Sequence, residues 1–236
     1  MRYSLLFLIL LSSCKVAYRT LLGVDTTPEW KSETALEQDF DRWSVASEQR
    51  FLMDTAGYTD RVVADAKMEF DQLPPEQQRD SVFEKKFRKV VNDNLQPVQI
   101  RYFDHRGKPV FKMVNCYLDG LRLDWNAQGA FDELPPRAPD SLLLRGNRPL
   151  DYFLPHLSRP NGKKLTLGDL PTADYYVLFF FNDILIKPSR KARRALQSLH
   201  TAHPESEVFV LYVNNHNEQI WGALSEEQRR LVRELR

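Results

Sequence analysis

The sequence predicts a mixed α/β fold, in which a helical N-terminal region precedes an α/β domain with a β-hairpin and a βαβ unit. Three observations support this prediction. Apolar residues recur at helical spacing through residues 28–95. Two strand-like runs flank a turn at Gly107. Two almost wholly apolar runs, 175–181 and 207–214, enclose the pattern of an amphipathic helix.

The first helix is predicted to begin at Thr26. Threonine can cap a helix, Pro28 suits a first turn, and Glu29 has the spacing of a capping box. The helix should therefore bury one stripe against the rest of the protein. That stripe consists of Leu36, Phe40 and Trp43.

Three further elements are expected in the mainly helical region. A short strand covers residues 49–55, a second helix covers 60–73, and a third helix runs from about 80 to 94. Prolines 74 and 75 end the second helix, because proline cannot continue the helical hydrogen-bond pattern. The third helix carries an apolar face formed by Phe83, Phe87, Val90 and Val91.

The middle of the chain, residues 96–159, is predicted to hold the hairpin and a proline-rich segment. Strands at 98–103 and 110–118 are joined by a turn in which Gly107 can take the positive φ that such turns require. Residues 120–160 are rich in proline and glycine, which indicates an extended wrapping segment.

The C-terminal region, residues 160–236, contains the predicted βαβ unit. Its strands at 175–181 and 207–214 should be buried on both faces, because they lack a polar side. The helix between them covers 188–201. A last helix is expected from Ser225 onward.

The entry to this region is similar to a known family. It reads Asn161-Gly162-Lys163-Lys164-Leu165-Thr166-Leu167-Gly168-Asp169-Leu170, and the apolar strand at 175–181 follows. This sequence resembles the hairpin and central strand of thioredoxin-like proteins, above all their membrane-tethered thiol-oxidoreductase branch. The resemblance covers about 160–215 and implies that 160–236 form a thioredoxin-like domain.

The resemblance does not extend to that family's Trp-Cys-x-Pro-Cys active site. Here the chain reads Ile186-Lys187-Pro188-Ser189, so Ile186 and Ser189 are the degenerate active-site positions. Thiol–disulfide exchange needs a thiolate and a second thiol, which neither residue supplies. The family also has a later hairpin entered through a cis-proline, whereas no proline follows Pro204 here. The resemblance therefore implies a redox-inactive domain, incomplete or rearranged at one edge.

The N-terminus predicts export and lipid anchoring. Arg2 precedes an apolar run at 5–11 that is too short to cross a bilayer core of about 30 Å. The next residues, Leu11-Ser12-Ser13-Cys14, resemble the lipobox of bacterial lipoproteins, which are cut before the cysteine and acylated on it. The resemblance implies a signal peptide at 1–13, lipidation of Cys14 and a tether at 14–27. An ordinary secretory signal with an incidental cysteine is the alternative.

Composition and charge limit the partners. The chain has 33 Lys and Arg residues against 32 Asp and Glu residues. Because this balance gives no broad basic field, we expect no nucleic-acid partner. The expected partners are the membrane, reached through the lipid anchor, and another envelope protein. A basic cluster on the helix at 188–201 would suit anionic headgroups or simply a solvated face. It consists of Lys187, Arg190, Lys191, Arg193 and Arg194.

Candidate metal and calcium sites are weak. His200 and His203 are spaced to share a metal ion, but the sequence offers no clear third ligand. The segment from Asp124 begins like a calcium loop, yet Pro135 takes the place of the required glutamate. No cofactor or metal is therefore expected.

The predicted function is that of a lipid-anchored cell-envelope protein whose redox-inactive domain acts as a binding or structural module. Lys15 is not the aspartate associated with inner-membrane retention, which favours the outer membrane of a Gram-negative bacterium. The alternative is a thiol-dependent oxidoreductase or peroxidase using Cys116, although the alternating residues around Cys116 favour a buried thiol. Three large aromatic residues would serve as partner anchors if exposed, but burial is the simpler use of each. They are Trp125, Phe131 and Trp221.

Overall fold

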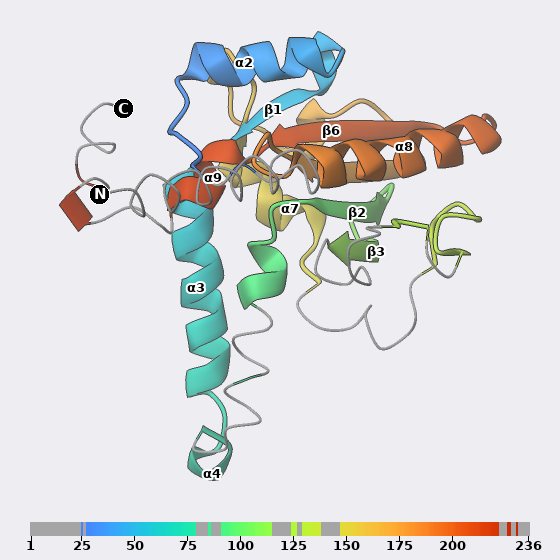
Figure 1. The fold of residues 1–236 in the computed structure, drawn as a ribbon. Helices are drawn as coiled ribbons and strands as arrows, with labels where there is room; N and C mark the ends of the chain where they lie inside the picture. Colours follow the sequence, from blue (N-terminus) through green and yellow to red (C-terminus); the bar gives the residue numbers. More distant parts are fainter. Residues whose placement is uncertain are drawn as a thin grey trace, which may run out of the picture.

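The protein forms one six-stranded mixed sheet with helices on both faces (Figure 1). The computed structural model describes residues 25, 27–78, 85, 91–114, 124–126, 129–137, 147–221, 226–227 and 230. The strand order is β3-β2-β5-β6-β1-β4. The strands are β1 (Arg50–Met53), β2 (Gln99–Asp104), β3 (Pro109–Val114), β4 (Leu157–Ser158), β5 (Tyr175–Phe181) and β6 (Val208–Asn214). The predicted α/β fold class is confirmed at this level.

Helix α2 (Glu33–Arg42) precedes these strands in the chain, and the other described helices lie between the strands or after the last one. They are α3 (Thr55–Asp71), α4 (Pro75–Gln78), α7 (Leu150–Phe153), α8 (Ile186–Ala202) and α9 (His216–Trp221). The described part also contains the 3₁₀ turns η2 (Ser47–Gln49), η6 (Leu154–His156) and η7 (Leu167–Asp169). Figure 1 shows α3 extending away from the sheet, with α4 beyond its far end.

The βαβ unit is present as predicted. Strands β5 and β6 are parallel, with Phe179 opposite Tyr212, and α8 connects them. Strand β1 extends the parallel part by pairing with β6. The β2–β3 hairpin pairs antiparallel with the other edge of β5, where Ile100 lies opposite Phe179. The hairpin, β1 and the βαβ unit therefore share one sheet, although the sequence suggests three consecutive regions.

Two helix starts differ from the prediction. Helix α2 begins at Glu33 rather than near Pro28, because the Ser32 hydroxyl caps it by accepting the Ala35 amide at 3.3 Å. Helix α3 begins at Thr55 rather than at residue 60, and the Asp54 side chain caps it. A side-chain acceptor at the N-cap satisfies one of the free amides of the first turn, so the caps decide where both helices start.

Strand β5 contributes to two hydrophobic layers. On one face its side chains pack with α2 and α8; these are Val177, Phe179 and Phe181. On the other face they pack with α3 and α7; these are Tyr176, Leu178 and Phe180. Because successive side chains of a strand point to opposite faces, a strand without polar residues needs cover on both sides. The packing therefore confirms the predicted two-sided burial.

Replacing Phe180 tests how much the layer beneath α3 and α7 stabilises the protein. Phe180 is fully buried, so we expect Phe180→Ala to lower the free energy of unfolding by about 3–5 kcal/mol. Urea denaturation followed by circular dichroism measures the change. Val63→Ala is the control, because Val63 is 45% exposed on α3 and should change stability by less than about 0.5 kcal/mol. Equal losses in the two variants would contradict this assignment of the core.

Candidate functional site

The candidate site lies where β5 ends and α8 begins. In open α/β sheets, ligands commonly bind outside the carboxyl ends of parallel strands. Here the loop at 182–185 follows β5, and residues 214–217 lie at the equivalent end of β6. Most of these loop residues carry polar side chains, and several of these side chains hydrogen-bond to other segments at this edge of the sheet.

The degenerate active-site positions lie together on the first turn of α8. Ile186 is half-buried and lines a surface hollow, whereas Ser189 is completely buried. The Ser189 hydroxyl donates to the carbonyl oxygen of Asn182 at 3.2 Å, and its oxygen lies 3.5 Å from the Asn182 amide. Pro188 occupies the first turn, where its missing amide costs no helical hydrogen bond. Ser189 therefore fastens the helix to the end of the strand.

Asn182 connects several segments at this edge. Its Nδ2 donates to the Pro97 carbonyl at 2.8 Å and to Asn215 Oδ1 at 3.0 Å. Its Oδ1 accepts the Leu185 amide at 2.9 Å. One buried carboxamide thus links the approach to β2, the end of β6 and the start of α8.

A buried carboxylate, Asp39 of α2, is the centre of an ion network. Its side chain is 1% exposed. Lys31 Nζ contacts Asp39 at 2.8 Å, Asn214 Nδ2 donates to it at 3.0 Å, and Arg42 also pairs with it. Lys31 and Arg42 reach a second carboxylate, that of Asp183, at 2.8 and 3.0 Å. Two cations thus balance two carboxylates, which offsets the cost of burying Asp39.

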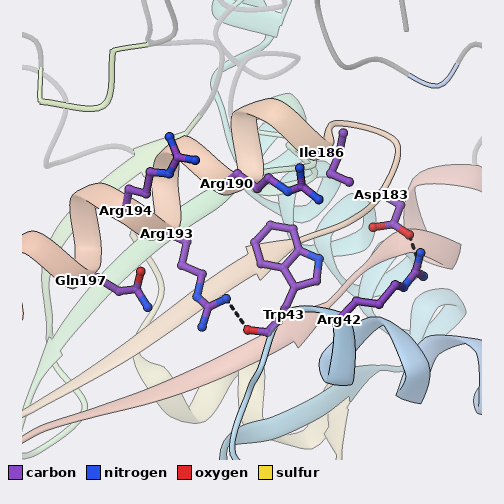
Figure 2. Close-up of a pocket in the computed structure, with 8 residues that line it drawn as sticks. All are labelled: Arg42, Trp43, Asp183, Ile186, Arg190, Arg193, Arg194 and Gln197. Atoms are coloured by element: carbon purple, nitrogen blue, oxygen red, sulfur yellow. Dashed lines mark hydrogen bonds and ion pairs between the residues drawn. The ribbon is translucent and has the colours of Figure 1, made fainter. Parts of the chain in front are cut away.

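The hollow next to this network has a volume of about 260 Å³ (Figure 2). One wall comes from the end of α2 and the loop after β5, through Arg42, Trp43 and Asp183. The other wall is α8, which contributes Ile186, Arg190, Arg193, Arg194 and Gln197. We call this space the arginine hollow. Three of the four residues that α8 places beyond its first turn in this wall are arginines.

Arg193 is the most constrained of these arginines. Its guanidinium carbon lies 5.9 Å from the centroid of the Trp43 ring and 5.7 Å from that of Tyr212, within cation–π range. One of its terminal nitrogens donates to the Trp43 carbonyl oxygen. Its Nε is buried and has no hydrogen-bond partner in the described part of the chain. Figure 2 shows Arg190 and Arg193 on either side of the Trp43 side chain.

A buried glutamate, Glu218, lies on α9, the helix that follows β6. Helix α9 packs against α3, and burial raises the pKa of Glu218 to about 8, although a hydrogen bond from Gln219 opposes the shift. No helix was predicted at 216–221. The local sequence shows only the end of strand β6 at Asn214 and then polar residues, which resemble a surface loop. Tertiary packing, rather than local pattern, therefore places this carboxyl group inside the protein.

The candidate histidines of α8 have separate local partners. Nε2 of His200 is hydrogen-bonded to the Tyr102 hydroxyl at 2.9 Å, and burial lowers the His200 pKa to about 4. His203 instead contacts Glu205 at 3.2 Å. Within the described ranges, no group of three or more His, Cys, Asp or Glu side chains is arranged to hold a metal ion.

The structure describes some, but not all, of the other residues that the sequence suggested as functional sites. Cys14 and Cys116 lie outside the described residues. The three large aromatic residues considered as exposed anchors are all buried, so that role is wrong for Trp125, Phe131 and Trp221. Phe131 packs edge-to-face on Phe111, for example, with 5.5 Å between ring centroids. In the segment that begins like a calcium loop, the Asn126 side-chain oxygen accepts the Phe131 amide at 2.7 Å, as in an ordinary turn.

Comparisons with known proteins add no relative. Searches of protein-family models, of curated proteins and of solved structures each gave no match to this chain. None of the helices in the described part combines the length and apolar composition that a membrane crossing requires.

The raised pKa of Glu218 predicts a pH dependence of stability. Between its ordinary value of 4.5 and the folded value of about 8, the folded state keeps a proton that the unfolded state has released. Stability should therefore fall as pH rises through this window, by at most about 1.4 kcal/mol per pH unit, and level off above it. Glu218→Gln should remove that slope, measured by urea denaturation from pH 5 to 9.

Glu76→Gln serves as the control, because Glu76 is exposed on α4 and should leave the slope unchanged. Subtracting each variant's curve from that of the unmodified protein isolates the contribution of the replaced residue. A Glu218→Gln protein with an undiminished slope would show that another group causes the dependence.

Proposed function

We propose that the chain is a lipid-anchored cell-envelope protein whose folded part is a redox-inactive, thioredoxin-like module that works by binding. The observation that carries this proposal is the state of Ser189. Where the thioredoxin-like pattern has its second thiol, this chain has a buried hydroxyl that bonds to Asn182. That contact is structural, and a serine hydroxyl cannot form a disulfide.

The thioredoxin-like part of the proposal rests on the sequence resemblance, which implies a βαβ unit. In that family a hairpin entered through a cis-proline follows this unit, whereas no proline follows Pro204 here. The β2–β3 hairpin pairs with β5 in antiparallel register, but it comes from the chain before the βαβ unit. We therefore propose a domain that is rearranged at one edge.

The chemistry of the site supports binding over catalysis. Ile186 offers no nucleophile, and the buried Ser189 hydroxyl is engaged with Asn182. What the edge does present is the arginine hollow, whose walls are held in place by the Asp39 network and by contacts to Trp43. Fixed cations around an indole suit noncovalent recognition of a ligand or partner.

The membrane part of the proposal rests on the lipobox-like sequence ending at Cys14. We expect Cys14→Ala to shift the protein from the detergent phase to the aqueous phase in Triton X-114 partitioning. Two or more acyl chains give stable anchoring, at about 0.8 kcal/mol per buried methylene, and the variant would lack them. Cys116→Ala is the control and should partition like the unmodified protein. Intact mass of the unmodified product should show the added acyl groups, and an unacylated product would contradict the proposal.

The redox-inactive part of the proposal is tested with the full chain purified in nonionic detergent. We expect it neither to reduce the disulfides of insulin nor to consume hydrogen peroxide above the buffer rate, because its α8 turn lacks both thiols. A Cys116→Ser protein assayed in parallel should give the same result. Activity that disappears in Cys116→Ser would overturn the binding proposal in favour of an enzyme using that thiol.

A further inference from the structure

The arginine hollow carries positive charge that no carboxylate balances in the described part of the chain. We propose that it binds a phosphate group, held chiefly by Arg190, Arg193 and Arg194. This inference rests on the proposed binding function and names the chemistry of the ligand.

The charges of the hollow divide into two groups. Arg42 belongs to the Asp39 network, where it and Lys31 are balanced by Asp39 and Asp183. The three arginines of α8 have no ion pair with any described carboxylate. Arg190 and Arg194 are exposed and lie four residues apart, so they project from the same side of the helix. Like charges at this spacing repel, which an anion between them would relieve.

Arg193 gives the hollow a preformed donor. The Trp43 carbonyl and the rings of Trp43 and Tyr212 already hold its guanidinium in place, so binding costs little side-chain entropy. Its Nε is buried and has no hydrogen-bond partner in the described part of the chain. The guanidinium is therefore not fully committed to protein acceptors and can still bind an oxyanion through its accessible nitrogens.

A phosphate fits these charges better than a carboxylate does. A carboxylate carries one negative charge, whereas a phosphate monoester carries nearly two at neutral pH and offers three acceptor oxygens. Guanidinium groups match the spacing of phosphate oxygens and can bind them in pairs. A hollow of about 260 Å³ admits the phosphate together with part of the group that bears it.

A second hollow of about 450 Å³ lies along the same helix and shares Arg194. It is less suited to an anion, because two cations, Lys191 and Arg194, line it with one carboxylate, that of Asp124. Four arginines line the arginine hollow with one carboxylate, that of Asp183, so the arginine hollow has the larger excess of positive charge.

The test uses the full chain in nonionic detergent and isothermal titration calorimetry with inorganic phosphate. We expect saturable binding that weakens as sodium chloride is added, because exposed charges are screened by salt. The double variant Arg190→Gln/Arg194→Gln should weaken binding about tenfold or more, since it removes two charged donors. The matched control Arg106→Gln/Arg137→Gln removes the same charge from exposed arginines elsewhere and should bind as the unmodified protein does.

A second arm separates a free phosphate from a lipid headgroup. Dihexanoyl phosphatidic acid, a lipid whose headgroup is a phosphate monoester, is titrated in the same way. Tighter binding of this lipid than of inorganic phosphate would assign the site to a headgroup, and the reverse order to a soluble phosphate compound. Quenching of tryptophan fluorescence that is lost in Trp43→Phe would place either probe in the arginine hollow.

Two results would overturn the inference. One is the absence of saturable binding by both probes, and the other is equal binding by the arginine-hollow variant and its control. Either result leaves the redox assays above unaffected, so failure of the phosphate site is distinct from failure of the proposed binding function.

Discussion

The structure depends on one constraint, which is that strand β5 has no face that water can solvate. All of its residues from Tyr176 to Phe181 are buried. The hairpin and β6 must cover its two edges, and helices must cover both of its faces. Because the edges and faces of β5 are covered, the loop that follows the strand is one of the few places near it that solvent can reach. The candidate site lies at this end of the strand for that reason.

A buried ion network at the same edge of the sheet further restricts how the elements can be placed. Asp39 draws Lys31, Arg42 and Asn214 to one point and so fixes α2, its leading segment and β6 relative to each other. Removing one member would leave an uncompensated charge in a region with little water. The network occupies Asp183, which lines the arginine hollow, and Asp39 beside it. The α8 arginines are therefore left to whatever binds there.

The elements nearest the centre of the sheet could be predicted from sequence, because their patterns are long and unambiguous. Strand β5 has the predicted bounds, and α8 and β6 differ from theirs by no more than two residues. The start of α2 was predicted at Thr26, whereas Ser32 caps the helix. The segment before Ser32 is held by Asn217 of α9, which hydrogen-bonds to the backbone of Lys31. These two residues lie 186 positions apart, so local sequence could not reveal the contact.

The degenerate motif directs attention to the start of α8, where Ile186 and Ser189 lie, and its role as a site stays a prediction. The composition of the hollow beside it could not be predicted. Nothing local indicated that Trp43 would meet Arg193, since 150 residues separate them. The basic cluster of α8 was visible in the sequence, but the lack of ion pairs between described carboxylates and Arg190, Arg193 and Arg194 depends on which carboxylates the fold brings close to Arg42 instead. The expected thioredoxin-like relationship and the lipidation of Cys14 remain predictions.

The backbone amide of Asp25 donates to the Ile184 carbonyl at 2.8 Å, which fastens the N-terminal approach to the edge where α8 begins. Eleven peptide steps separate Asp25 from Cys14. A fully stretched chain of that length reaches at most about 40 Å. An acyl group on Cys14 would thus keep this edge of the sheet within about 40 Å of the bilayer. The electrostatic field of anionic lipids decays over about 8 Å at physiological ionic strength. The tether would therefore let the folded part move several decay lengths away from the membrane surface.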